Sequence, residues 1–255
     1  MLHKPPTHIH RRAFGLGAFG LGAIGVGLGL RASAARAQGR PFTIVALGDS
    51  LTAGFGVRRS EALPARLDAR LRAAGYQVRV VNAGLSGDTS AGALARFDFA
   101  VPRGTNGLLL AIGANDMLQG LSPVAARNNI EAIITRAKAR NIKVVLLGMR
   151  APTNWGAAYR RAFDAIYPDL ARKHGLPLDP FILEGVALNP ALNQADGIHP
   201  TPAGADRIAA RITPLWRVVL VCALPIHLPR NNPTRPVHVF KESRKHVTLA
   251  LNHTF

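Results

Sequence analysis

Three side chains in this 255-residue chain have the chemistry needed to break an acyl bond: Ser50, Asp196 and His199. The hydroxyl of Ser50 becomes a nucleophile once a base takes its proton. The imidazole of His199 suits that base, because imidazoles exchange a proton near neutral pH. Asp196 precedes His199 by three residues in an Asp-Gly-Ile-His turn, where its carboxylate could accept a hydrogen bond from one ring nitrogen and leave the other facing Ser50.

Acyl transfer also needs donors for the negative oxygen that develops in its transition state. The candidate donors are the backbone N–H groups of Ser50 and Gly87 and the side-chain amide of Asn115. One such donor is typically worth about 3–4 kcal/mol of the barrier. The sequence therefore indicates a nucleophilic serine with an oxyanion hole.

Each residue alone also has a simpler interpretation. Ser50 would fit a turn with a helix cap, and Gly87 and Asn115 are of types common in turns. We expect Asp49 and Asp88 to brace loops or cap helices rather than to act in catalysis. The joint occurrence of these residues, each in a loop of its own, favours the catalytic interpretation.

The elements that must position these residues are short apolar strands. Residues 42–47 are nearly all apolar, as is typical of a strand buried on both faces in a parallel sheet, and Gly48 then allows a sharp turn. The loop holding Gly87 follows the second such run, and Asn115-Asp116 follows the third; we interpret Asp116 as structural, like Asp49. The four further runs are residues 78–81, 107–112, 143–149 and 176–181.

Segments with helical spacing alternate with these strands. They are residues 61–74, a helix capped by Asp88 or Thr89 and running to Phe97, a helix opened by Ser122-Pro123, residues 155–174, and residues 203–216. This alternation predicts parallel βαβ units with right-handed crossovers in a three-layer α/β sandwich. Loops after parallel strands gather along one edge of the sheet, which would bring the candidate residues together. No internal repeat or long linker divides residues 41–217, so we interpret them as one domain.

Four motifs resemble the sequence blocks of the GDSL/SGNH hydrolases: GDSL at 48–51, SGDTS at 86–90, GAND at 113–116 and DGIHP at 196–200. The resemblance covers nearly all of residues 41–217. It is strongest to the small bacterial esterases that include the multifunctional periplasmic thioesterase/lysophospholipase and the arylesterases. It implies a flavodoxin-like α/β/α fold with a five-stranded parallel sheet, and neither a metal nor an organic cofactor.

The resemblance also implies the roles of the site residues. Ser50 would be the nucleophile, Gly87 and Asn115 would be oxyanion donors with the Ser50 N–H, and Asp196 and His199 would complete the triad. The serine is not in the G-x-S-x-G elbow of α/β-hydrolases, but a triad depends on geometry rather than on a motif.

The implied substrates are small-molecule esters or thioesters of acyl chains. Residues 118–121 and 149–158 fall where acyl-binding loops would lie. Two alternatives remain: a carbohydrate O-acetylesterase with the same apparatus, and a non-catalytic surface-binding protein on the same scaffold. The intact set of chemical residues speaks against the second alternative.

The formal net charge of +18 is spread along the chain, with +6 in residues 1–40, +4 in residues 218–255 and +8 between them. No basic run interleaved with aromatic residues occurs, so we predict no nucleic-acid site. The single cysteine, Cys222, cannot form an internal disulfide and has no metal-ligand spacing around it. Oligomeric state does not follow from these features.

Both ends of the chain depart from the domain pattern. Arg11-Arg12, a weakly apolar stretch at 15–30 and Ala35-Arg36-Ala37 predict a twin-arginine-like export signal over residues 1–37, cleaved after Ala37, and hence a periplasmic or secreted protein. The alternative is a retained membrane anchor, although the stretch is short for a span of about 20 apolar residues.

At the other end, the apolar run 218–224 would finish the last helix. The remainder of the basic tail, residues 218–255, is predicted to be disordered, with a late frameshift or a stray hairpin as alternatives. Its charge would allow weak contact with an anionic membrane surface, and we assign it no function.

Overall fold

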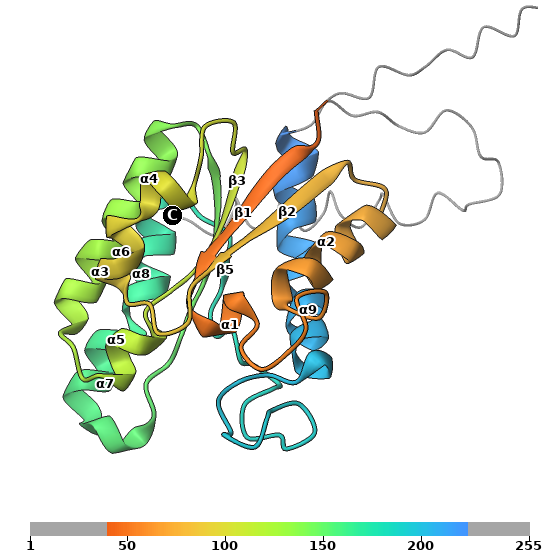
Figure 1. Cartoon of the computed structure of the whole chain (residues 1–255). Helices are drawn as coiled ribbons and strands as arrows, with labels where there is room; N and C mark the ends of the chain where they lie inside the picture. The colour runs from red at the N-terminus through yellow and green to blue at the C-terminus, as the bar shows by residue number, and fades with distance from the viewer. Residues whose placement is uncertain (1–39, 224–255) are drawn as a thin grey trace, which may run out of the picture. The chain divides into compact units, whose positions relative to one another are not determined.

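The structure is a computed structural model that describes residues 40–223. The predicted export signal over residues 1–37 and the tail from residue 224 onward lie outside the described residues. Within residues 40–223, five parallel strands form one sheet in the order β2-β1-β3-β4-β5 (Figure 1). The strands are β1 (Phe42–Gly48), β2 (Val78–Gly84), β3 (Gly107–Ala111), β4 (Lys143–Leu147) and β5 (Leu178–Asp179).

Helices cover both faces of this sheet. Helices α2 and α9 pack against each other on one face, and α3, α6 and α8 lie on the other (Figure 1). The predicted three-layer α/β/α fold with a five-stranded parallel sheet is therefore confirmed. The helices are α1 (Ser50–Ala53), α2 (Leu63–Ala73), α3 (Ser90–Ala95), α4 (Phe97–Ala100), α5 (Ala114–Leu118), α6 (Pro123–Ala139), α7 (Gly156–Asp164), α8 (Ile166–His174) and α9 (Pro202–Ala223), with a 3-10 turn η1 (Thr153–Trp155).

The core lies between the sheet and its helices. β1 and β3 are central and almost entirely buried, as their unbroken apolar runs predict for strands covered on both faces. Helix α6 turns its predicted apolar positions inward, and Ile130, Ile133 and Ile134 are fully buried. The Ser122 hydroxyl caps the first turn of α6. Pro123 lies in that turn, where the missing N–H of a proline costs no hydrogen bond.

The helix predicted over residues 155–174 is in fact broken. Following η1, α7 ends at Asp164 and α8 begins at Ile166. The physical reason is Pro168, which lacks an N–H and would clash with the preceding turn inside a continuous helix. Starting a new helix at Ile166 places Pro168 in the first turn, where that N–H is not needed.

Three other elements differ from the prediction. The helix expected to run to Phe97 ends at Ala95, and α4 follows after a bend at Arg96. A short helix, α5, stands where Asn115-Asp116 was expected to form only a turn. The fifth strand contains only Leu178–Asp179, because the prolines on either side cannot donate to a strand ladder.

Helix α9 continues through residues 218–223, and Leu220 is fully buried. The apolar run after Trp216 thus extends the last helix, as the sequence indicates. Among the described helices, none is both long and apolar enough to cross a bilayer.

Candidate active site

Ser50 begins α1 immediately after the central strand β1. The carboxylate of Asp49 accepts a hydrogen bond from the Leu51 N–H at 3.0 Å and so caps this short helix. The expectation that Asp49 serves as a cap is therefore confirmed. A side chain at Gly48 would collide with Thr52 and with the Ala111 carbonyl, so only glycine lets α1 approach the end of β3 this closely.

The structure brings the side chains of Ser50, His199 and Asp196 into one hydrogen-bonded chain. His199 Nε2 lies 2.9 Å from Ser50 Oγ, and His199 Nδ1 lies 2.7 Å from Asp196 Oδ2. Ser50 and His199 are 149 positions apart in the sequence. The geometry is that of a hydroxyl, an imidazole and a carboxylate in series, which can move a proton from the hydroxyl to the ring.

Asp196 is fixed by its own turn. Its Oδ1 accepts the N–H groups of Ile198 and His199, both at 3.0 Å, while Gly197 takes a left-handed φ of 75°. Hydrogen bonds from the backbone and ring of His199, followed by that from Ile198, lower the pKa of Asp196 to about 2. The carboxylate is therefore ionised at neutral pH and able to stabilise a protonated ring.

Two side chains that the sequence analysis missed hold the loop of His199. The Gln194 side chain donates to the carbonyls of Phe55, at 2.7 Å, and Pro200, at 3.0 Å. The Phe55 ring lies against the His199 imidazole, with centroids 4.6 Å apart. These contacts join the loop after α1 to the loop before α9.

The three candidate oxyanion donors occupy the ends of β1, β2 and β3. The Ser50 N–H is the first of α1, where a helix offers no internal acceptor. Gly87 is exposed with a φ of 81°, and a side chain there would meet nothing within 4 Å, so glycine is required by the backbone rather than by space. Asn115 Nδ2 donates to the Asp88 carbonyl at 2.9 Å, which leaves its second N–H for another acceptor.

A buried polar cluster joins the loops that carry these donors. Both oxygens of Asp116 accept from Ser90, one from its N–H at 2.7 Å and one from its hydroxyl at 2.5 Å. Asn129 of α6 donates to the same hydroxyl at 3.0 Å. Asp116 and Ser90 are 3% and 0% exposed, so this cluster ties α5 to the start of α3. Asp116 braces the loop, as predicted.

Asp88 braces its loop, as expected. Its carboxylate pairs with Arg96 at 2.7 Å, a partner that the sequence did not reveal. Thr89 is the residue that caps α3, through a hydrogen bond from the Gly92 N–H.

Asp49 lies nearby with its carboxyl buried. Burial, with a smaller contribution from the charge of Asp88, raises the pKa of Asp49 to about 6 despite the Leu51 hydrogen bond.

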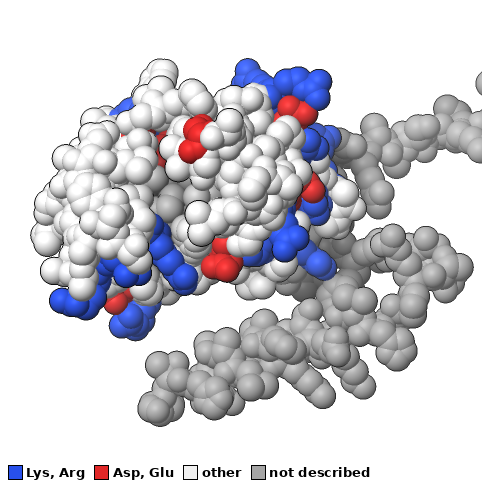
Figure 2. Space-filling view, turned by 90° about the horizontal axis from the view of Figure 1, so that it is seen from below, with Lys and Arg blue, Asp and Glu red and all other residues white. Residues whose placement is uncertain are grey.

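The two predicted acyl-binding loops lie beside each other. A Cβ on Gly120 would sit 3.0 Å from the Trp155 ring, and the Tyr159 hydroxyl donates to the Leu121 carbonyl at 2.9 Å. Leu118 and Leu121 are 52% and 41% exposed. Figure 2 views the molecule from the side to which α1 and the loop of Asp196 extend in Figure 1, and wide areas of that side carry no charge.

Among residues 40–223, no group of three or more His, Cys, Asp or Glu side chains is arranged to hold a metal ion. The hydrogen-bonded chain from Ser50 to Asp196 and the neighbouring donors define the candidate site.

Comparison with known proteins identifies the class. The family described as GDSL-like lipase/acylhydrolase matches residues 46–207, and the chain belongs to this family. It is 38% identical over 179 residues to Esterase TesA of Pseudomonas aeruginosa, covering 70% of this chain and 89% of that protein. It is 39% identical to the Escherichia coli K12 protein named thioesterase 1/protease 1/lysophospholipase L1, covering 68% and 84% of the two chains.

Solved structures agree. A crystal structure of TesA matches with a TM-score of 0.66 at 38% identity, covering 70% of this chain and 99% of that one. AlinE4, an SGNH-hydrolase family esterase, matches with a TM-score of 0.60 at 43% identity, covering 73% and 98%. The protein is a carboxylic ester hydrolase of the esterase/thioesterase type, and neither the sugar O-acetylesterase nor the non-catalytic alternative is favoured.

Proposed function

We propose that this protein hydrolyses carboxylic esters and thioesters of acyl chains, with Ser50 as nucleophile, His199 as general base and Asp196 as its partner. The observation that carries the proposal is the continuous chain from Ser50 Oγ to His199 Nε2 at 2.9 Å and from His199 Nδ1 to Asp196 Oδ2 at 2.7 Å. Each contact is short enough for proton transfer or for fixing the ring tautomer.

In the acylation step, the Ser50 oxygen attacks the carbonyl carbon while its proton passes to His199 Nε2. Asp196 stabilises the resulting imidazolium, which is consistent with a carboxylate whose pKa is lowered to about 2. Collapse of the tetrahedral intermediate breaks the bond to the alcohol or thiol. His199 gives its proton to that leaving group, and the acyl chain remains on Ser50.

Deacylation repeats the sequence with water. His199 takes a proton from the water while the water oxygen attacks the acyl carbon. The second tetrahedral intermediate then collapses and releases the carboxylic acid. The proton returns from His199 to the Ser50 oxygen. In both steps the carbonyl oxygen becomes negative, and we assign its stabilisation to the N–H groups of Ser50 and Gly87 and to the Asn115 amide.

The proposed substrates follow from the surroundings of the site and from the relatives. Exposed Leu118 and Leu121 offer apolar contact for an acyl chain beside the loop of Trp155. The relatives are named as esterases, an arylesterase and a thioesterase/lysophospholipase, which supports oxygen esters and thioesters alike.

The proposed organisation of the chain is an export signal, the hydrolase domain and a basic tail. Export through residues 1–37 and weak contact of the tail with anionic membranes stay predictions. Amino-terminal sequencing of the secreted protein should begin after Ala37, and an intact Met1 in the membrane fraction would contradict cleavage.

The test of the proposed function is the Ser50→Ala variant assayed with the unmodified enzyme on one substrate panel. The panel holds p-nitrophenyl esters of rising chain length, an acyl-CoA, a lysophospholipid and an acetylated sugar. We expect the enzyme to hydrolyse the acyl esters and the thioester, and the variant to lose that activity while keeping its circular dichroism spectrum. Full activity in the variant, or activity confined to the acetylated sugar, would overturn the proposal.

A further inference from the structure

We propose that Arg96 is a positioning residue for the oxyanion donors, holding the loop of Gly87 against the ends of β1 and β2. This inference rests on the proposed function, since it assigns a support to the donors named there. It concerns a residue that does not touch the substrate and that acts through the loop it binds.

Arg96 lies at the bend between α3 and α4, where the backbone leaves the helical conformation with a ψ of 6°. Its side chain is 21% exposed and reaches the ends of β1 and β2. Nε donates to the Asp88 carboxylate at 2.7 Å, Nη1 to the Ala83 carbonyl at 2.8 Å and Nη2 to the Gly48 carbonyl at 3.1 Å. One planar group thus joins three separate segments.

Two of these acceptors lie within two residues of a candidate donor. Gly48 ends β1, two residues before Ser50, and Asp88 directly follows Gly87. The backbone carbonyl of Asp88 in turn accepts the Asn115 amide at 2.9 Å. By fixing Asp88, Arg96 therefore acts on the loop of Gly87 directly and on Asn115 through that carbonyl.

The charge of Arg96 is needed as well as its shape. The Asp88 side chain is 5% exposed, and Asp49, which is 2% exposed, has its pKa raised partly by the charge of Asp88. Without the guanidinium, two carboxyl groups would lie buried behind Ser50 with less compensation. A lysine could supply the charge but not three donors in a fixed fork.

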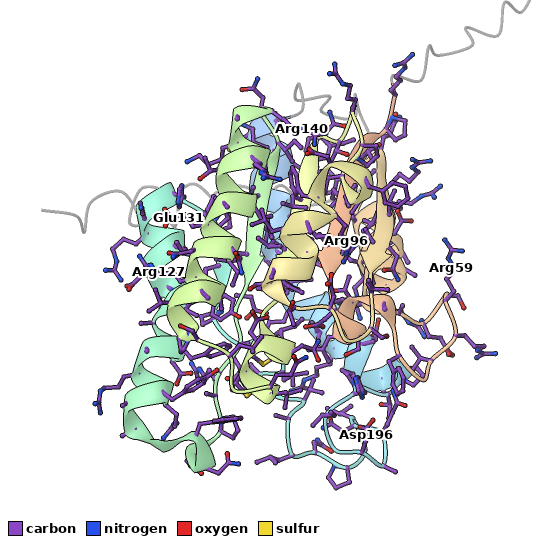
Figure 3. All side chains as sticks on the ribbon, turned by 60° about the vertical axis from the view of Figure 1, so that its left-hand side comes forward. Arg59, Arg96, Arg127, Glu131, Arg140 and Asp196 are labelled. Atoms are coloured by element: carbon purple, nitrogen blue, oxygen red, sulfur yellow. The ribbon has the colours of Figure 1, made fainter. Side chains whose placement is uncertain are left out.

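Arg140 provides a matched control. It also binds a loop carbonyl, that of Pro102 at 2.9 Å, and lies 3.6 Å from the Asp98 carboxylate, with a side chain that is 28% exposed. Figure 3 shows Arg140 toward the opposite end of the molecule from Asp196, with Arg96 between them. Loss of Arg140 removes a carbonyl hydrogen bond and a contact with an exposed carboxylate, neither of which involves a residue of the candidate site.

The experiment measures kcat and KM of Arg96→Gln, Arg96→Lys and Arg140→Gln with a short p-nitrophenyl ester, together with thermal unfolding. We expect Arg96→Gln to lower kcat about 10- to 100-fold with KM changed less than about threefold, because displaced donors weaken the transition state more than the ground state. Arg96→Lys should still lose about tenfold in kcat, and Arg140→Gln should stay within about twofold. If Arg96→Gln does not fold, the kcat of Arg96→Lys tests the inference.

A second measurement separates positioning from plain stability. Arg96→Gln should cost a smaller factor in the Asn115→Ala background than in the unmodified enzyme, because part of its effect passes through that amide. A folded Arg96 variant with unchanged kcat, or an equal factor in both backgrounds, would overturn the inference. Either result alongside an inactive Ser50→Ala enzyme would leave the proposed function standing, whereas an active Ser50→Ala enzyme would remove that function itself.

Discussion

The side-chain amide of Asn115 donates a hydrogen bond of 2.9 Å to the backbone carbonyl of Asp88. The bond orients the amide plane and joins the loop after β3 to the loop after β2. An amide held in this way offers its remaining N–H without reorganisation during the reaction, which is the property that makes oxyanion donors effective.

Replacement of Asn115 by alanine should therefore lower kcat by about 10²–10³-fold while KM changes little. Steady-state kinetics with a p-nitrophenyl ester measures this. Asn106→Ala is the control, because Asn106 accepts the Thr43 N–H at the start of β1 and supports the sheet far along the strand from Ser50. A loss below twofold in Asn115→Ala would remove this residue from the oxyanion hole.

Gly87 can be compared with a second glycine of almost the same φ. Gly87 and Gly104 have φ values of 81° and 85°, and a Cβ at either would meet nothing within 4 Å. Alanine at each position should cost about 1–2 kcal/mol of stability through backbone strain alone. We expect only Gly87→Ala to lower kcat, since its N–H is a candidate donor. Equal kcat values for the two variants would argue against that role.

The low pKa of Asp196 predicts a pH dependence of stability. Its ordinary value of 3.8 is lowered to about 2 in the native state, so the ionised carboxylate stabilises the fold above about pH 4, and this contribution is lost as the pH falls toward 2. The difference in free energy of unfolding between the native protein and Asp196→Asn should be constant above about pH 5 and shrink below pH 4. Urea unfolding at each pH measures it, and a difference unchanged down to pH 2 would contradict the prediction.

The raised pKa of Asp49 predicts the opposite dependence of stability on pH. Burial raises its pKa from 3.8 to about 6, so the native state keeps a proton that the unfolded chain releases, and stability falls as the pH rises from about 4 to 6. Asp49→Asn keeps an oxygen for the Leu51 N–H but cannot ionise. Relative to the native protein it should gain on the order of 2–3 kcal/mol between pH 4 and pH 7. A stability difference that does not vary over this range would show that Asp49 titrates normally.

Much of the fold and of the candidate site was predictable because it rests on local signals. The apolar runs of β1 and β3 are stable only where both faces of the strand are buried. The turn from Asp196 to His199 positions both side chains within four residues. The loops after these strands meet because parallel strands end at one edge of the sheet. The break in the helix over residues 155–174 was not predicted, although Pro168 marks it, since a proline fits the first turn of a helix better than its interior.

The supports of the site were not predictable in the same way. Arg96 binds a carbonyl 48 positions away, and Gln194 binds one 139 positions away. An arginine or a glutamine with no local partner resembles any solvent-facing residue in the sequence. Only the bend after α3 and the closure of the last loop bring these side chains to their acceptors.

The contact between Ser50 and His199 has a consequence for how the enzyme is made. The proposed nucleophile lies just after β1, the first strand among the described residues, and its proposed base lies just before α9. A growing or truncated chain that stops before residue 199 therefore carries the serine without that base. Strand β1 must also pair with β3 across an intervening strand and four helices before that serine is in place. Ester hydrolysis can thus be used to measure complete folding, because it begins only after residues from both ends of the domain are in contact.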